Sequence, residues 1–171
     1  AQEYGFLIIE DDPYSKLSYS GFEKPPIKAF DNSGHVLYLG SFSKIFIPGV
    51  RVGWVVADKE IIQKLSLAKQ ATDLCSNSMG QRLIAACGEE GIIDRQIKKL
   101  QKIYRQRRDV ILDSLNKYFP AEVSWTKPEG GFYIWVDLPE GIDSKELLYK
   151  AIDENVAYVT GSAFHIDDGG K

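Results

Sequence analysis

The stretch VLYLGSFSKIFIPGVRVGWVVA, residues 36–57, holds two short apolar runs separated by a loop that is rich in polar residues and glycine. The runs, 36–41 and 52–57, are rich in Val, Leu, Tyr and Trp, residues that suit β-strands. Short, nearly continuous apolar runs are typical of strands that are buried on both faces. We therefore predict two buried strands, the first of which ends in the polar sequence Ser-Phe-Ser-Lys.

Further strands and helices are predicted on both sides of this stretch. Upstream, residues 6–11 indicate another fully buried strand, with acidic residues at its C-terminal end. Downstream, Asp58 is a suitable N-cap for a helix over 59–72. A second helix is expected from residue 76 or 77 to residue 89. A third, over 92–118, carries an apolar stripe at mostly three- and four-residue steps.

The last part of the chain has a different pattern. Short strands are predicted over 123–125 and 132–138, on either side of a Gly-Gly turn. A short helix ending at residue 152 and a last strand over 156–160 follow. The sequence therefore predicts an α/β region of buried, parallel-type strands, joined by a long helix to a small α+β unit.

The composition argues against several functional classes. Twenty-one Lys and Arg stand against 24 Asp and Glu among 171 residues, so a nucleic-acid-binding face is not expected. The chain has no apolar run of the ~18 residues that a membrane span needs, and its first residues do not resemble a signal peptide. Its two cysteines and two histidines lack metal-ligand spacing. We expect a cytoplasmic protein that binds no metal, nucleic acid or membrane.

Three predicted strand ends carry polar residues with useful chemistry. The sequence DDPY (11–14) ends the first strand, SFSK (41–44) ends the second, and Arg51 precedes the third. Ligands of open α/β sheets bind outside the carboxyl ends of the strands, so these side chains are expected to converge there. Taken singly, each has an ordinary explanation as a turn residue or a solvated side chain. In this order, and beside apolar strands, the combination is far more specific.

With these motifs the sequence resembles the fold-type-I pyridoxal-phosphate enzymes, in particular the class I and II aminotransferases of the 2-aminoadipate and aromatic transaminase branch. The matching motifs are EDDPY (10–14), GSFSK (40–44), PGVRVGW (48–54), PEGGF (128–132) and GSAF (161–164). The resemblance covers essentially the whole chain. It implies that 1–91 form the later part of the large domain, a mainly parallel sheet with helices on both faces. Residues 92–171 would form the α+β C-terminal small domain, incomplete at its C-terminus.

The resemblance also assigns roles to individual residues. Lys44 would form a Schiff base with the aldehyde of pyridoxal 5′-phosphate and later move a proton at the substrate Cα. Asp11 would keep the pyridine nitrogen protonated, whereas Asp12 would point to the other face of the strand. Tyr14 would donate a hydrogen bond to the ring 3-oxygen. The cofactor phosphate would be bound by Ser41, Ser43 and Arg51.

The implied activity is transamination between an amino acid and a 2-oxo acid, a biosynthetic step of amino acid metabolism, in a homodimer with residues 73–78 near the interface. Two alternatives stay open: the aminotransferase-like sensor domain of a winged-helix transcription regulator, and a lyase or decarboxylase on the same fold. The family's remaining cofactor residues would precede residue 1, and its substrate-carboxylate arginine would follow residue 171. We therefore expect these residues to be part of a longer protein and to be inactive alone.

Overall fold

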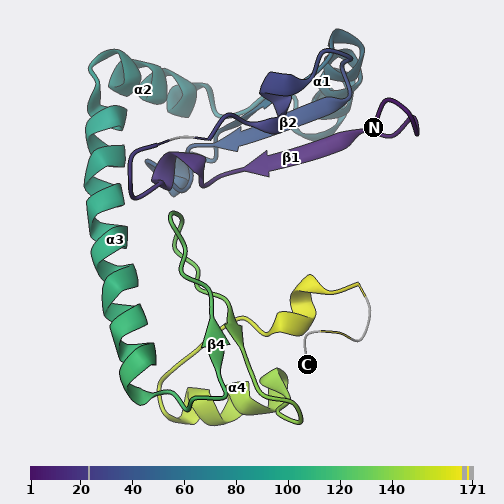
Figure 1. The fold of residues 1–171 in the computed structure, drawn as a ribbon. Coiled ribbons are helices and arrows are strands. Elements are labelled where there is room, and N and C mark those ends of the chain that lie inside the picture. Colours follow the sequence, from purple (N-terminus) through teal and green to yellow (C-terminus); the bar gives the residue numbers. More distant parts are fainter. Residues whose placement is uncertain (23, 167–168, 170–171) are drawn as a thin grey trace. The chain divides into compact units, whose positions relative to one another are not determined.

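A computed structural model describes residues 1–22, 24–166 and 169 (Figure 1). The chain divides into two compact units, which are described separately. The first unit comprises residues 1–110 and 128–132, and the second comprises 111–127 and the residues from 133 onward. The boundary after residue 91 that the resemblance implies stays a prediction. The sequence Asp-Asp-Gly-Gly at 167–170, which is typical of a turn, lies outside the described residues, apart from Gly169.

The first unit contains a three-stranded sheet in the order β1–β2–β3 (Figure 1). Strand β1 (Ile8–Asp12) pairs in parallel with β2 (Val36–Ser41), and β2 pairs in antiparallel fashion with β3 (Gly53–Val56). All three strands lie where the sequence predicted them, but the parallel type holds for β1 and β2 only. The connection 42–52 is shorter than the dozen or so residues that a parallel crossover needs, so β3 returns antiparallel.

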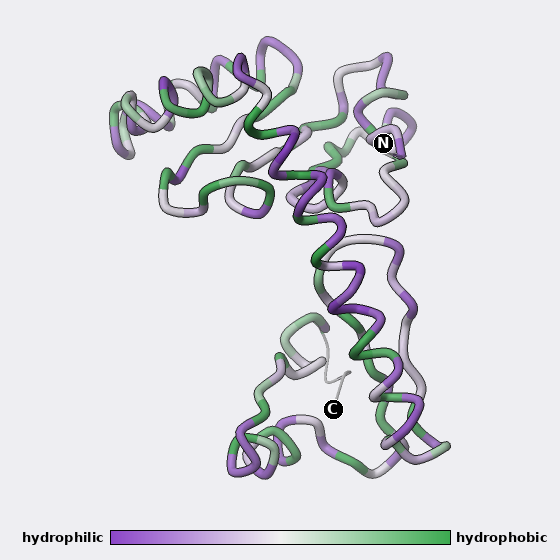
Figure 2. The backbone as a smooth tube through the Cα atoms, turned by 90° about the vertical axis from the view of Figure 1, so that its left-hand side faces the viewer, coloured by the Kyte–Doolittle hydropathy of each residue, from purple (hydrophilic) through white to green (hydrophobic). Residues whose placement is uncertain are grey.

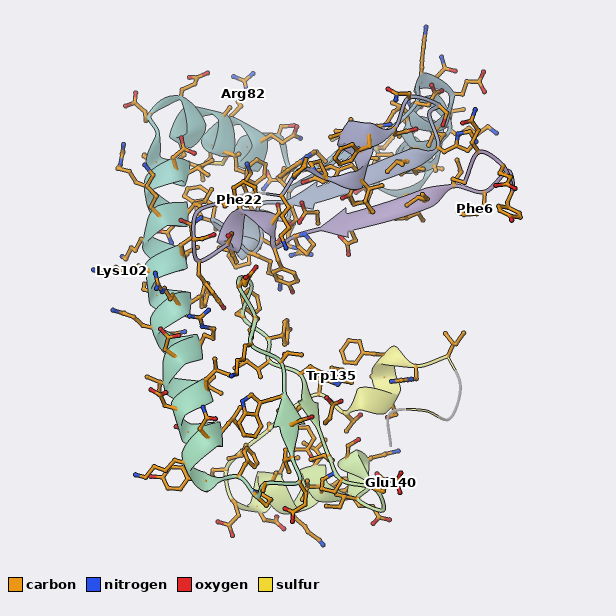
Figure 3. All side chains as sticks on the ribbon, viewed as in Figure 1. Phe6, Phe22, Arg82, Lys102, Trp135 and Glu140 are labelled. Carbon is orange, nitrogen blue, oxygen red and sulfur yellow. The ribbon has the colours of Figure 1, made fainter. Side chains whose placement is uncertain are left out.

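The strands are less buried than the sequence predicted. Ile9 is 67% exposed, and all four residues of β3 are exposed. Phe6, just before β1, is 51% exposed (Figure 3). The prediction of fully buried strands is therefore wrong for the chain as described. The physical reason is that no described α-helix packs extensively against the faces of β1 or β3.

Local capping defines the helices of the first unit. Helix α1 (Lys59–Asp73) begins after Asp58, whose side chain accepts a hydrogen bond from the Glu60 amide. Helix α2 (Ser78–Glu89) begins after Asn77, which accepts from the Gly80 amide in the same way. Helix α3 (Ile92–Tyr118) starts in the first unit and ends in the second. Hydrophilic and hydrophobic residues alternate along it, as Figure 2 shows.

Three short 3-10 helices connect the strands of the first unit: η1 (Ser15–Leu17), η2 (Ile27–Phe30) and η3 (Pro48–Val50). The Glu10 carboxylate on β1 accepts hydrogen bonds from the first two amides of η2, at 2.8 and 2.9 Å. Leu17 at the end of η1 is fully buried. It belongs to the core of the unit, together with Val36, Ile45 and Ile84.

The second unit is a small α+β assembly. Strands β4 (Ser124–Trp125) and β5 (Val136–Asp137) pair in antiparallel fashion, so the strand predicted over 132–138 is much shorter than expected. Helix α4 (Ser144–Asp153) and the 3-10 helix η4 (Gly161–Phe164) follow. Among the described residues, no helix is long and apolar enough to cross a membrane.

The last predicted strand, over 156–160, is absent from the described structure, so this prediction is wrong. The segment pairs with neither β4 nor β5, which are each only two residues long and so offer little backbone for a third strand to pair with. A side chain holds the segment instead: the Tyr158 hydroxyl donates a 2.7 Å hydrogen bond to the Ser144 carbonyl at the start of α4.

Candidate active site

The strand order brings the predicted site residues to one edge of the first unit's sheet. In the parallel β1–β2 pair, Asp12 lies opposite Gly40, so the C-terminal ends of both strands share that edge. In the antiparallel β2–β3 pair, Ser41 lies opposite Gly53. Arg51, two residues before Gly53, therefore enters the same edge. This is the convergence of strand ends that the sequence predicted.

Two glycines allow β2 and β3 to meet at this edge. A Cβ atom on Gly40 would overlap the indole of Trp54, its register partner. A Cβ atom on Gly53 would lie only 2.8 Å from the Gly40 carbonyl oxygen. The Trp54 ring also packs on Phe42, with 4.8 Å between ring centroids. The glycines of the GSFSK and RVGW motifs are thus required for the packing at the start of the loop 42–46, which carries Lys44 and is called the lysine loop.

The lysine loop itself, residues 42–46, is a tight turn. The Phe46 amide donates a 2.9 Å hydrogen bond to the Phe42 carbonyl, and Ile45 is 5% exposed. Lys44 precedes this buried anchor and is itself exposed. The loop therefore has a fixed, buried side and presents its lysine on the other.

Asp12 is committed to contacts within the chain. Its carboxylate accepts hydrogen bonds from the Ser15 amide at 2.9 Å and from the Tyr38 hydroxyl at 3.0 Å. Burial by itself raises the pKa of Asp12, but the hydrogen bonds from Ser15 and Tyr38 outweigh it and lower the pKa below 3.8. Burial, followed by the bond to Asp12, raises the pKa of Tyr38 to about 12.

Asp11 lies on the opposite face of β1 from Asp12. Burial alternates along the strand, so that Glu10 and Asp12 are half-buried whereas Ile9 and Asp11 are exposed. The structure thus separates the two adjacent acids: Asp12 joins β1 to its neighbours, and the Asp11 carboxylate lies on the exposed side. This placement is compatible with the role that the resemblance implies for Asp11.

An aromatic cluster stands beside the lysine. The Lys44 Nζ atom lies 5.8 Å from the centroid of the Phe132 ring. The Tyr14 ring meets Phe132 edge to face at 5.0 Å, and the Tyr104 ring meets it at 5.3 Å. Sequence reasoning placed Phe132 in the PEGGF motif but gave it no role. Its contacts come from residues far apart in the sequence, so only the motif itself pointed to it.

The three predicted phosphate ligands, Ser41, Ser43 and Arg51, are not all linked by the hydrogen bonds of the described structure. The Ser43 amide donates a 3.1 Å hydrogen bond to Ser41 Oγ. Arg51 adopts the left-handed conformation, with φ 55° and ψ 44°, and its guanidinium donates to the Pro48 carbonyl at 3.3 Å. A non-glycine residue in this region costs on the order of 1 kcal/mol or more, and such residues gather at functional sites. In the described contacts the guanidinium bonds to its own turn and to neither serine.

The donor set fits a phosphorylated pyridine aldehyde. Lys44 offers an exposed amine for the aldehyde, Asp11 offers a carboxylate for a protonated ring nitrogen, and Tyr14 offers a phenol for a ring oxygen. Hydroxyl groups and a guanidinium for a phosphate come from Ser41, Ser43 and Arg51. Among the described residues, no group of three or more His, Cys, Asp and Glu side chains is placed to hold a metal ion.

Comparison with known proteins gives consistent matches over the whole chain. Residues 1–171 match the family model described as aminotransferase class I and II. The aromatic-amino-acid aminotransferase 1 of Thermococcus litoralis is 49% identical over 164 residues, which are 96% of this chain and 39% of that protein. Transcriptional regulators of the helix-turn-helix type match at 35% identity and below. The chain thus spans about two fifths, or less, of the length of the curated relatives that it matches.

Solved structures agree with the fold. The multiple substrate aminotransferase of Thermococcus profundus superposes with a TM-score of 0.94 at 50% identity, over 100% of this chain and 42% of that chain. The α-aminoadipate aminotransferase of Thermus thermophilus, complexed with N-(5′-phosphopyridoxyl)-L-leucine, gives a TM-score of 0.91 at 35% identity. That match covers 99% of this chain and 44% of the neighbour. The predicted fold class and the resemblance to the aromatic and aminoadipate branch are confirmed.

Proposed function

Because this chain belongs to the class I and II aminotransferase family, we propose that the full-length protein transfers an amino group between an amino acid and a 2-oxo acid. Its cofactor in this proposal is pyridoxal 5′-phosphate. The observation that carries the proposal is the exposed Lys44, in a loop with a buried anchor at the sheet edge where β1 and β2 end. Relatives named as aminotransferases support this activity over the whole length of the chain.

Three residues would carry the chemistry. The cofactor supplies an aldehyde that accepts amines and a ring that withdraws electrons from the substrate Cα. The Lys44 amine would hold the cofactor through its aldehyde, and after exchange with the substrate amine it would remove the Cα proton and deliver it to the cofactor carbon. The Asp11 carboxylate keeps a proton on the ring nitrogen, and the Tyr14 hydroxyl donates a hydrogen bond to the ring 3-oxygen.

The phosphate would be bound by Ser41, Ser43 and Arg51. The Ser41–Ser43 turn is already ordered by its internal hydrogen bond, so both hydroxyls enter the site at little entropic cost. The Arg51 guanidinium would exchange its bond to the Pro48 carbonyl for paired bonds to phosphate oxygens. The left-handed backbone at Arg51 directs this side chain from a fixed position at the edge of the sheet.

We also propose that the enzyme is a cytoplasmic homodimer that acts in amino acid biosynthesis. The surface that supports a partner is the segment 73–78, where α1 ends and α2 begins, together with the neighbouring Met79 on α2. Leu74 has φ 63° and ψ −55°, and the Cys75 amide donates to the Asp73 carbonyl at 2.7 Å, which is a strained γ-turn. Leu74 and Met79 are 78% and 83% exposed. Two exposed large apolar side chains, one of them in a strained turn, suit a subunit interface.

The test uses the full-length protein and the variant Lys44→Ala, with Lys64→Ala on the exposed surface of α1 as the matched control. The wild type and the control are expected to transfer amino groups from aromatic amino acids or 2-aminoadipate to a 2-oxo acid. Borohydride should fix the cofactor to the peptide that contains Lys44, as read by mass spectrometry. Lys44→Ala should lose both properties, and amino transfer at near wild-type rate by this variant would refute the proposal.

The same assays separate the alternatives. A lyase or decarboxylase would release ammonia or carbon dioxide in place of a new amino acid. A regulator would bind the cofactor and DNA without turning over amino acids. Neither alternative is favoured, because the relatives of higher identity are named as aminotransferases.

A further inference from the structure

The segment 128–132 is held in the first unit although the residues on both sides of it belong to the second. Its backbone pairs with the end of η1. The Tyr19 amide donates to the Glu129 carbonyl at 2.8 Å, and the Gly131 amide donates to the Leu17 carbonyl at 3.2 Å. The segment is therefore a strap that is tied by its main chain to a fully buried residue, Leu17.

Two side chains complete the attachment of this strap. The Tyr19 hydroxyl donates a 2.8 Å hydrogen bond to the Gly131 carbonyl. The Arg108 guanidinium on α3 lies 4.7 Å from the centroid of the Tyr19 ring and donates to the Pro128 carbonyl at 2.9 Å. It is also bonded to Asp109, and its side chain is only 20% exposed. Tyr19 and Arg108 thus hold both ends of the strap and stack on each other. We call these two residues the latch.

The strap has little room to move under these ties. A Cβ atom on Gly130 would lie 3.0 Å from the Leu17 carbonyl oxygen and 3.1 Å from the Ser18 Cα atom. Burial raises the pKa of Tyr19, partly offset by the nearby Arg108 charge, so the phenol stays protonated and able to donate. Phe132 directly follows Gly131, the glycine whose carbonyl accepts from Tyr19, and its ring faces Lys44 and Tyr14.

We propose that Tyr19 and Arg108 are positioning residues that act through Phe132. By fixing the strap, they set the Phe132 ring against Lys44 and Tyr14, and so fix the direction from which the lysine amine reaches the substrate Cα. A reacting group that is misplaced by a fraction of an ångström loses rate rather than binding. This inference rests on the proposed function, because it assigns the lysine its catalytic task.

The test compares Tyr19→Phe and Arg108→Lys with the controls Tyr4→Phe and Arg82→Lys in the full-length protein. Tyr4 is 78% exposed, and Arg82 lies on the surface of α2 (Figure 3). The Phe variant keeps the ring for Arg108 but loses the bond to Gly131, and the Lys variant keeps the charge but loses the planar fork. Each is expected to lower kcat about three- to tenfold, the size of one hydrogen bond, with KM within about twofold of wild type.

A second measurement does not depend on turnover. In the cofactor-free protein, amide hydrogen exchange over 128–132 should be about tenfold faster in Tyr19→Phe than in wild type or Tyr4→Phe. If the wild type shows no amino transfer, the proposed function fails, and the exchange result still decides whether the latch holds the strap. Unchanged exchange would overturn the latch itself.

The variant Phe132→Leu decides whether the latch acts through Phe132. If it does, adding Tyr19→Phe to Phe132→Leu should cause no further loss of kcat, although exchange over the strap still becomes faster. A latch that only stabilises the fold would lower kcat additively in that background, or would leave kcat unchanged in Tyr19→Phe despite faster exchange. Either result would overturn the positioning role.

Discussion

The two units differ in what their polar side chains do. In the first unit, three separate motifs bring Asp11, Lys44 and Arg51 to one sheet edge, and each of these side chains is exposed there. In the second unit, the described polar contacts serve the unit's own elements: Asp143 caps α4, and Tyr158 bonds to Ser144. The difference indicates that changes in the first unit can damage chemistry without unfolding the protein. Comparable changes in the second unit should affect stability alone.

The largest expected effect comes from exchanging neighbouring acids in the first unit of the full-length protein. Asp11→Asn should lower kcat by several orders of magnitude while the cofactor still binds, because the ring nitrogen loses the carboxylate that keeps it protonated. Asp12→Asn should leave kcat within about fivefold, because the Asn carbonyl still accepts from the Ser15 amide. Steady-state kinetics and the visible spectrum of the bound cofactor measure both. Greater damage from the Asp12 change would place the chemistry on the other face of β1.

A smaller effect is expected from the core of the first unit. Leu17→Ala truncates the one large side chain that is fully buried among the described residues, and should lower the free energy of unfolding by about 3 kcal/mol. The control Leu67→Ala, at a position that is 67% exposed, should change it by less than about 0.5 kcal/mol. Urea unfolding of the full-length protein gives both values. Equal losses would show that the first unit lacks the core described for it.

The Asp12–Tyr38 hydrogen bond allows the first unit to be tested by changing the pH. The bond should contribute on the order of 1 kcal/mol to the free energy of unfolding. The pKa of Asp12 is lowered by folding, so its contribution is complete above pH 3.8 and is lost as the pH falls through the folded value. The pKa of Tyr38 is raised from 10.0 to about 12, so its contribution is complete below pH 10 and is lost as the pH rises toward 12. The stability difference between wild type and Tyr38→Phe should therefore be constant between pH 4 and 10 and shrink outside that window. A difference that does not depend on pH would show that the bond is not formed.

The features that the sequence predicted correctly follow from a local cap and from a general rule of parallel strand pairing. Asp58 caps α1 as predicted, because its cap bond reaches only two residues along the chain. The ends of β1 and β2 also meet as predicted, since parallel strands place their carboxyl ends at one edge. The roles of Asp11, Tyr14 and Lys44 rest on the family resemblance and stay predictions.

The features that the sequence missed depend on distant partners. The direction of β3 follows from how it pairs with β2, and the strand expected over 156–160 lacks a described partner to pair with. The place of Phe132 beside Lys44 depends on the strap 128–132, which Tyr19 and Arg108 hold. Tyr19 lies 109 residues before the first residue of the strap, and Arg108 lies 20 residues before it. No window of sequence around Phe132 contains these residues.

The smallest expected effect lies in the second unit and completes the comparison. Tyr158→Phe removes only the hydroxyl that bonds to the Ser144 carbonyl at the start of α4, and the ring remains in place. A neutral hydrogen bond of this kind contributes about 1 kcal/mol, so the midpoint of urea unfolding should fall slightly while kcat and KM stay within about twofold of wild type. Tyr149→Phe, at a position that is 63% exposed on α4, is the matched control and should leave both stability and kinetics unchanged. A loss of kcat in Tyr158→Phe with unaltered stability would mean that the second unit also shapes the chemistry, and the division of tasks between the two units would have to be abandoned.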